Sequence, residues 1–325
     1  MVVRFMGLVF FLMLGYGFAA QETQYATSTV LMVPPEGFQY NPETAKSNTY
    51  QHHLSISNLK AKVMSEFHQM VAKLRKNGIE VVVFKQDPYL VDAVFPNNWF
   101  STHVDEKGET TLLLYPMLTQ SRQKEVNPVQ LRKTLKEHRI VMRQTIDLRN
   151  DQNQILEGTG SMILDREHHR IYAAISPRTD PVLVKKVGSL LGYQPILFHS
   201  VDALGKAIYH TNVMMGLAKQ YAVLCLDCIP NKQERDKVVA TLKQDKKQII
   251  VINQDQVGHM CGNVLELKNN QGKNILVMSK QAYDHYTPEQ LNLMRHFSKI
   301  VPVQLNLIEA IGGGSARCML AEIYH

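Results

Sequence analysis

The chain lacks the features of a nucleic-acid-binding protein. Its 325 residues carry a formal net charge of +7, but no run of five or six lysines and arginines occurs anywhere in the sequence. Nucleic-acid binding generally needs clustered cations together with stacking aromatic side chains. Dispersed positive charge carries little information about partners, so we expect no nucleic-acid partner.

Long hydrophobic runs are missing beyond the first twenty residues. A transmembrane helix needs about 20 predominantly apolar residues. No later segment approaches that length, so we expect no membrane association after removal of the N-terminal segment. A proline- or glycine-rich linker is missing as well. With 45% hydrophobic residues, enough for a full core, the sequence predicts a single domain over residues 21–325.

The first twenty residues have the pattern of a secretory signal peptide. Arg4 precedes the uncharged stretch 5–20, which is too short to span a bilayer comfortably. Gly17 and Ala19 supply small residues at the −3 and −1 positions of a signal-peptidase cut. We therefore predict a signal peptide over 1–20 and a secreted or periplasmic protein. The alternatives are an uncleaved membrane anchor, or a start codon placed too early, which would make the protein cytoplasmic.

Only four cysteines occur in the chain. Cys225 and Cys228 have the C-x-x-C spacing of redox or zinc sites, but a zinc site requires a second ligand pair at short spacing, and none is obvious. We expect neither a metal nor a cofactor. In an oxidising compartment these two cysteines can pair, although a strand entering a turn over 221–230 favours ordinary core cysteines. Cys261 is another candidate nucleophile.

Short segments rich in Val, Ile and Leu alternate with amphipathic segments, which is typical of an α/β fold. We expect strands at 30–33, 81–84, 111–115, 171–175, 222–226, 249–252 and 275–278, and helices at 60–77, 127–137, 181–191, 232–244 and 288–297. Segments 157–164 and 261–267 resemble each other, since each is a small-residue turn followed by an apolar strand. Such a repeat indicates a ring of similar modules.

Residues 312–318, with the sequence GGGSARC, contain a candidate nucleophile. A glycine run lets the backbone approach a ligand closely, and Arg317 would favour the thiolate of the neighbouring Cys318. Glu157 and His210 lie far upstream. One cysteine, one histidine and one acid supply the thiol nucleophile, the proton shuttle and the orienting group of a cysteine-dependent enzyme.

Four motifs follow one another in the order seen in the amidinotransferase superfamily: 92–99 (DAVFPNNW), 157–161 (EGTGS), 210–212 (HTN) and 312–318 (GGGSARC). This superfamily includes arginine deiminases, dimethylarginine dimethylaminohydrolases and citrulline-utilization hydrolases. The chain most resembles the last group, from about residue 28 onward and including 41–45 (NPETA). The resemblance implies the α/β pentein fold, a five-bladed ββαβ propeller with the active site along its central axis.

The resemblance also implies roles for individual residues. Cys318 matches the family nucleophile, His210 the general acid/base and Glu157 the acid beside them. Asp92 matches a substrate-contacting aspartate of the dimethylarginine hydrolases. Arg122 lies in the stretch where those enzymes place an arginine for the substrate carboxylate.

Three asparagines bear on the substrate. Asn98 and Asn212 occupy positions where arginine deiminases hold a cationic guanidinium with two aspartates, and Asn97 lies beside the first as a turn former or a further site residue. A desolvated guanidinium without its counter-charges would cost several kcal/mol. Asparagines can instead donate to a carbonyl oxygen and accept from an amide N–H, which suits the neutral ureido group of citrulline.

The leading hypothesis is therefore a cofactor-free hydrolase that converts citrulline to ornithine, ammonia and carbon dioxide. A second hypothesis keeps the chemistry but takes arginine or another guanidino compound, with citrulline as product, because Asp92 and Glu157 still supply negative charge. A third is a catalytically idle secreted protein that binds a ligand or a host partner. The partner expected from the first two is a small ureido or guanidino amino acid, and no oligomeric state is predicted.

The signal-peptide hypothesis predicts a mature N-terminus near Ala20 or Gln21. N-terminal sequencing of the native protein measures this directly. Recovery of the full-length chain from the soluble cytoplasm would contradict export and favour a misassigned start.

Overall fold

A computed structural model describes residues 25–149 and 154–325, so the predicted signal peptide lies outside the described residues. The strands are β1 Thr29–Met32, β2 Glu80–Val83, β3 Phe100–Val104, β4 Thr110–Leu114, β5 Gln144–Asp147, β6 Ile163–Asp165, β7 Arg170–Ile175, β8 Gln194–His199, β9 Met215–Leu217, β10 Tyr221–Cys225, β11 Gln248–Ile252, β12 Leu265–Lys268, β13 Asn274–Ser279, β14 Lys299–Val303 and β15 Ala321–Ile323.

The helices are α1 Pro42–Ala45, α2 Leu59–Lys76, α3 Gln120–Gln123, α4 Pro128–Glu137, α5 Gly158–Ser161, α6 Pro181–Leu191, α7 Thr211–Met214, α8 Lys232–Gln244, α9 Gln254–Gly258, α10 Lys280–His285, α11 Pro288–Phe297 and α12 Asn306–Gly312, with a 3-10 turn η1 at Pro96–Asn98. Every strand and helix expected from the sequence is present, and no boundary differs by more than one residue. β6 and β12 overlap the apolar strands expected at the ends of 157–164 and 261–267, whereas the short helices and six strands (β3, β5, β8, β9, β14 and β15) lie outside every expected range.

Within the described residues the strands form five three-stranded sheets, β15-β1-β2, β3-β4-β5, β6-β7-β8, β9-β10-β11 and β12-β13-β14. In each sheet the middle strand is antiparallel to the first and parallel to the third. A parallel pair needs a crossover connection, and α2, α4, α6, α8 and α11 lie in these connections. Each sheet is therefore one ββαβ unit, and the expected five-bladed fold is confirmed.

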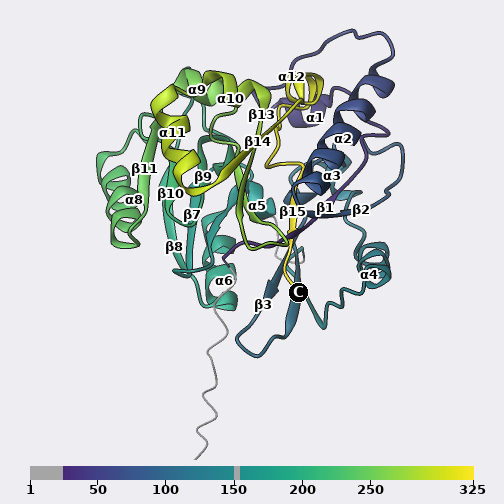
Figure 1. The fold of residues 1–325 in the computed structure, drawn as a ribbon, viewed down its shortest axis with the longest axis horizontal. Coiled ribbons are helices and arrows are strands. Elements are labelled where there is room, and N and C mark those ends of the chain that lie inside the picture. The colour runs from purple at the N-terminus through teal and green to yellow at the C-terminus, as the bar shows by residue number, and fades with distance from the viewer. Residues whose placement is uncertain (1–24, 150–153) are drawn as a thin grey trace, which may run out of the picture.

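The two ends of the chain complete one blade together. β15 pairs antiparallel with β1, with Thr29 opposite Ile323, while β2 pairs parallel on the other side of β1. Figure 1 shows β1 and β15 side by side, with α4 and α8 at the outer edges of the molecule. The strand that follows residues 312–318 is thereby paired with β1.

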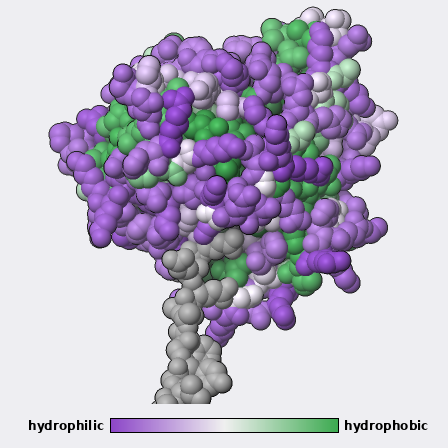
Figure 2. All heavy atoms as spheres, viewed as in Figure 1, coloured by the Kyte–Doolittle hydropathy of each residue, from purple (hydrophilic) through white to green (hydrophobic). Residues whose placement is uncertain are grey.

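Side-chain caps explain where four of the five long helices begin, whereas α2 begins without one. Asn127, Asp180, Asn231 and Thr287 each accept a hydrogen bond from a backbone N–H in the first turn of α4, α6, α8 and α11. Such caps satisfy donors that have no partner inside the helix. The helices also contact strands of neighbouring blades, since α8 contacts β8 as well as β11 and α2 contacts β14 as well as β2. The face shown in Figure 2 is mostly hydrophilic. Among the described helices, none is both long and apolar enough to cross a membrane.

A short turn precedes the first strand of four blades, and these turns lie close together. η1 leads into β3, α5 into β6 and α7 into β9, and α5 contacts both η1 and α7. Asn263 lies just before β12, and its side chain reaches Cys318, just before β15. The similarity noted between 157–164 and 261–267 therefore reflects equivalent positions in two blades. Most of the expected site residues lie in or beside these turns.

Candidate functional site

A pocket opens where the turns meet. Its walls include five of the predicted site residues, namely Asp92, Asn98, Arg122, His210 and Cys318, together with Thr44, Asn48, Gln51, Phe95, Arg178, Tyr209, Gly312 and Gly314. The remaining three, Asn97, Glu157 and Asn212, are fully buried and contact wall residues. The structure thus gathers all eight predicted residues around one pocket.

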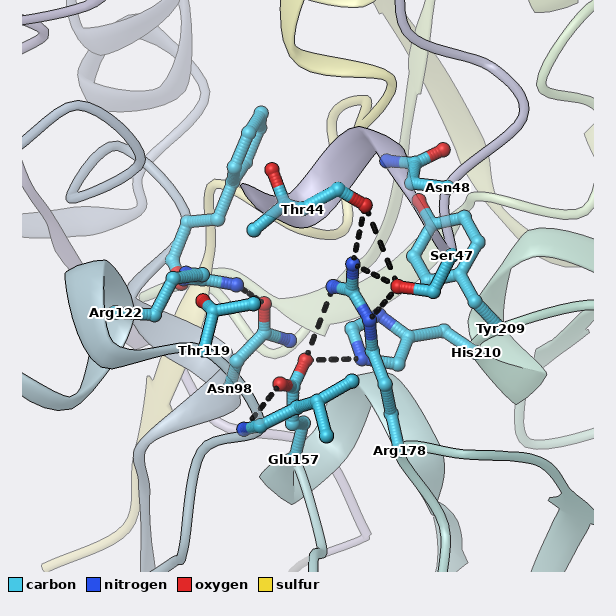
Figure 3. A network of polar contacts seen from close by, with 12 residues as sticks. Thr44, Ser47, Asn48, Asn98, Thr119, Arg122, Glu157, Arg178, Tyr209 and His210 are labelled. Carbon is cyan, nitrogen blue, oxygen red and sulfur yellow. Dashed lines mark hydrogen bonds and ion pairs between the residues drawn. The ribbon is translucent and has the colours of Figure 1, made fainter. Parts of the chain in front are cut away.

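Glu157 connects the deepest part of the site (Figure 3). Its Oε2 atom lies 2.8 Å from Nε2 of His210 and 3.2 Å from Nη1 of Arg178, and its Oε1 atom accepts from the backbone N–H of Leu118 at 3.1 Å. A carboxylate can only accept, so Nε2 of His210 carries the hydrogen. The Nδ1 atom of the ring is therefore left as a proton acceptor.

Burial and neighbouring charges change the pKa values of Glu157 and His210. Burial alone would raise the pKa of Glu157, but the Arg178 guanidinium and the hydrogen bond from His210 hold it below its ordinary value. Burial lowers the pKa of His210 to about 4, although the hydrogen bond and the charge of Glu157 oppose this. At neutral pH the site therefore contains an ionised Glu157 and a neutral His210.

Two asparagine amides surround the sulfur of Cys318. Nδ2 of Asn263 lies 3.2 Å from Sγ, and Nδ2 of Asn212 lies 3.5 Å from it. The Asn263 side chain is fixed at its other end, because Oδ1 accepts from the backbone N–H of Arg317 at 2.9 Å. The Oδ1 atom of Asn212 is buried and has no hydrogen-bond partner among the described residues. The sulfur therefore faces neutral donors.

Backbone groups of the glycine run are hydrogen-bonded to other parts of the protein. The N–H of Gly313 donates to the carbonyl oxygen of Glu309 at 2.9 Å, where φ is +61° and the helix α12 ends. The carbonyl oxygen of Gly313 accepts from the hydroxyl of Tyr209 at 2.6 Å, and that of Gly312 accepts from Nε2 of Gln51 at 2.9 Å. Gly313 therefore has no free N–H to offer.

Arg122 is engaged with protein groups. Its Nε and Nη2 atoms form a two-pronged ion pair with Glu125 at 2.9 and 2.8 Å, and Nη1 donates to Oδ1 of Asn98 at 2.6 Å. This contact fixes the amide of Asn98, whose Nδ2 atom donates to Oδ1 of Asn97 at 3.0 Å. In this structure Arg122 therefore orients the side chain of Asn98.

Asp92 presents an unused oxygen. Its Oδ2 atom accepts from Nδ2 of Asn41 at 2.8 Å and from the hydroxyl of Thr44 at 3.1 Å. Its buried Oδ1 atom has no partner within residues 25–149 and 154–325. Burial raises the pKa of Asp92, against the opposing charge of Arg122. A cationic group entering the pocket would satisfy this oxygen and favour its ionised form.

Several site residues were not singled out from the sequence. Arg178 follows β7 and reaches the carbonyl oxygen of Thr44 and the hydroxyl of Ser47 at 2.9 and 2.8 Å. It therefore ties the covering segment 41–51 to Glu157. The motif 41–45 was part of the resemblance, and Asn263 lies in the segment compared with 157–164. Segment 41–45 and Asn263 could therefore have been recognised from these two observations, whereas no local sequence pattern distinguished Arg178.

Cys261 does not compete with Cys318. Its sulfur lies 3.5 Å from the carbonyl oxygen of Ala282, beside α10. Burial raises the pKa of its thiol to about 12, which disfavours the thiolate needed for attack.

In the described part of the chain, one group of acidic and histidine side chains has the spacing of metal ligands, Asp165, His168 and Asp245. Lys247 lies 3.3 Å from Asp165, and Arg170 lies 3.3 Å from Asp245. Protein cations therefore already compensate both carboxylates.

Comparisons with known proteins define the class of this fold and site. The N-terminal domain of ArgZ, a cyanobacterial arginine dihydrolase, with a cysteine replaced by serine and bound to substrate, matches with a TM-score of 0.71 at 15% identity over 91% of this chain and 98% of that chain. A dimethylarginine dimethylaminohydrolase variant carrying an S-methyl-L-thiocitrulline adduct matches with a TM-score of 0.60 at 12% identity over 92% and 100%. The fold is thus that of the amidinotransferase, or pentein, superfamily.

AgrE in complex with ornithine and NAD+ also matches, with a TM-score of 0.70 at 17% identity over 91% of this chain and 39% of that longer chain. A comparison of the sequence with curated proteins gave no match. The family model described as N,N dimethylarginine dimethylhydrolase, eukaryotic, matches residues 34–325. The chain belongs to this family, whose relatives are hydrolases of C–N bonds in arginine-like compounds.

Gly160 is required by the close approach of two site residues. A Cβ atom at this position would lie 2.4 Å from Nδ2 of Asn98 and 2.8 Å from Nδ1 of His210. Gly160→Ala should displace both side chains and lower kcat/KM on the preferred substrate by about a hundredfold, the usual cost of misplacing reacting groups by about 1 Å. Gly258→Ala is the matched control, because no described atom lies within 4 Å of its added Cβ. Equal activity of the two variants would contradict this role.

Asn263 should control the reactivity of Cys318. Loss of a hydrogen bond to a charged group typically costs about 1.5–3 kcal/mol, so Asn263→Ala should slow alkylation of Cys318 by iodoacetamide at pH 7 by roughly tenfold or more. Asn263→Asp can still accept from Arg317 but places a carboxylate beside the sulfur, and should slow it further. Peptide mass spectrometry locates the label. Wild-type alkylation rates in both variants would exclude this interaction.

Proposed function

We propose that the protein is a cysteine-dependent C–N hydrolase that acts on the ureido group of citrulline and releases ornithine, ammonia and carbon dioxide. The observation that carries this proposal is the neutral environment of the Cys318 sulfur. The amides of Asn263 and Asn212 donate to this sulfur, at 3.2 and 3.5 Å. The carbon of an uncharged group, such as a ureido group, can lie beside this sulfur without needing a counter-charge.

The charges of the site support the same substrate class. Glu157 lies 3.2 Å from Arg178, and Glu125 lies 2.8 Å from Arg122, so both carboxylates already have counter-charges. A guanidinium beside Cys318 would be desolvated among amides, which costs several kcal/mol. A ureido group instead needs a donor for its carbonyl oxygen and an acceptor for its NH2 group. Nδ2 of Asn98 and the unpartnered Oδ1 of Asn212 supply them.

In the first step the Cys318 sulfur attacks the ureido carbon. Neutral His210 accepts the thiol proton on Nδ1, because its Nε2–H is directed to Glu157. The oxyanion of the tetrahedral intermediate is stabilised by the amide of Asn98, which Arg122 holds in orientation. His210 then donates the proton to the departing δ-nitrogen, and ornithine leaves. The product on the enzyme is a carbamoyl thioester.

In the second step a water molecule replaces ornithine. His210 removes a proton from this water as its oxygen attacks the thioester carbon, and the proton returns to the sulfur as the C–S bond breaks. The carbamate that is released decomposes to ammonia and carbon dioxide. Glu157 stabilises the protonated imidazole in both steps, since its own carboxylate stays ionised beside Arg178.

A second candidate is hydrolysis of a guanidino group, as in arginine or dimethylarginine. The family and structural relatives favour it, because their names refer to arginine and dimethylarginine. The unpartnered Oδ1 atom of Asp92 favours it as well, because this carboxylate can accept a cationic group. In the citrulline proposal the same oxygen accepts from the α-ammonium group of the substrate.

The two candidates differ in specificity and in products. We expect kcat/KM for citrulline to exceed that for arginine and dimethylarginine by roughly a hundredfold, the value of two charge-assisted hydrogen bonds with partial additivity. Ornithine and citrulline are quantified together with ammonia, and Cys318→Ala serves as the inactive control. A preference for either guanidino compound would reject the citrulline proposal in favour of the second candidate. Absence of turnover and of a covalent mass adduct on Cys318 would reject both.

Two matched substitutions test the charge argument. Asn212→Asp places a carboxylate near the sulfur and should shift the citrulline-to-arginine ratio toward arginine by about tenfold or more. Asn98→Asp should shift it less, because Arg122 lies 2.6 Å from Oδ1 of Asn98 and would neutralise the new charge. The ratios are measured under identical conditions. An unchanged ratio in Asn212→Asp would show that amide neutrality does not set the specificity.

A further inference from the structure

The thiols of Cys225 and Cys228 lie next to each other, away from the sulfur of Cys318. Cys225 is the last residue of β10, and Cys228 lies in the following turn, where its carbonyl oxygen accepts from the backbone N–H of Val201 at 2.8 Å. Their sulfur atoms are 2.6 Å apart, and both side chains are buried. This separation is well inside the contact distance of two unbonded sulfurs and approaches the roughly 2.05 Å of a disulfide.

The turn differentiates the two thiols. The contact with the Cys228 thiol, together with backbone N–H groups of Cys228 and Asp227, holds the pKa of Cys225 below its ordinary value, although burial opposes this. The neighbouring Cys225 sulfur and burial raise the pKa of Cys228. Cys225 is thus the thiol with the larger thiolate fraction, and Cys228 lies beside it, in position to attack it once it is oxidised.

A zinc site does not account for the pair. Structural zinc requires four ligands, and two cysteines supply half of them. Within the described residues, the one group of at least three potential ligand side chains lies elsewhere, at Asp165, His168 and Asp245.

We propose that Cys225 and Cys228 form an intramolecular disulfide when the chain folds in the presence of a low-molecular-weight disulfide. The Cys225 thiolate attacks one sulfur of that disulfide and expels one thiolate, which takes the proton of Cys228. The Cys228 sulfur then attacks Cys225 and expels the second thiolate. This second thiolate takes up a proton from solvent, equivalent to the one that Cys225 released on ionising. The two cysteines thus lose two protons and two electrons in all, and the small disulfide becomes two thiols.

Burial determines when this exchange takes place. Neither sulfur is exposed in the folded protein, so exchange takes place during folding, once the local turn over 225–228 has formed and before other segments cover it. The finished disulfide is then protected from reductants. The disulfide would lie near the pocket, but neither cysteine lines it. Tyr50 packs against the apolar cluster that contains both cysteines, and its ring is 6.2 Å from that of Tyr209, a pocket residue. Cys318 remains a free thiol in both states.

The experiment refolds the full chain in a buffer of reduced and oxidised glutathione and, separately, in excess reductant. The reduced sample should show four thiols when denatured and titrated, and the oxidised sample two. The peptide that contains residues 225–228 should be lighter by two hydrogen atoms. Iodoacetamide should still label Cys318 in the oxidised sample. Four thiols in both samples, a disulfide that includes Cys318, or stoichiometric zinc bound to the pair would overturn the proposal.

Two single variants provide the control. Cys261→Ser should still lose two thiols on oxidative refolding, because the buried Cys261 is not part of the pair. Cys225→Ser should lose none. If Cys225→Ser does not fold, Cys228→Ala replaces it, and the peptide mass of the wild-type chain decides the outcome independently of either variant. Loss of two thiols from a variant that lacks one member of the pair would contradict the assignment.

Discussion

The site depends on one buried carboxylate, that of Glu157. It is fully buried, yet it binds Arg178, His210 and the backbone N–H of Leu118, which come from three adjacent blades. An ionised carboxylate without partners in such a position would cost several kcal/mol, so each donor is needed. The carboxylate in return fixes the position of each donor. Arg178 extends the network to segment 41–51, which covers the pocket.

Around this carboxylate, the protein arranges its ionised groups in pairs and leaves amides beside the reacting sulfur. Arg122 and Glu125 form the second pair, and their position next to Asn98 determines which end of that amide faces the guanidinium. Oδ1 accepts from Arg122 and Nδ2 gives one hydrogen to Asn97, so the second hydrogen of the NH2 group is the one available to the pocket. An amide without such a partner would be free to rotate and present either end. The chemistry of the proposed site therefore depends on charges that do not touch the sulfur.

The regular elements were predictable where their own residues determine them. The five long helices have apolar faces, four of them also have side-chain caps, and the seven expected strands are apolar runs. The unpredicted strands lack this pattern: β5 is mostly exposed, β8 and β14 contain Pro195 and Pro302, and β9 and β15 have three residues each. Proline is tolerated at sheet edges, which is where β8 and β14 lie. These strands exist because a neighbouring strand offers hydrogen bonds, which a single-segment pattern does not reveal.

The sequence by itself determined the superfamily and the five-bladed architecture, and it predicted that Glu157, His210 and Cys318 lie together, because these residues stand in ordered local motifs. Only the tertiary structure decided the partners of each group. Arg178 reaches Thr44 from 134 residues away, and Asn263 reaches Cys318 from 55 residues away. It also showed that Gly313 has no free N–H and that Arg122 is paired with Glu125. Local patterns record propensity and periodicity, whereas ion pairs and orphaned polar atoms arise only when distant segments are packed together and their water is removed.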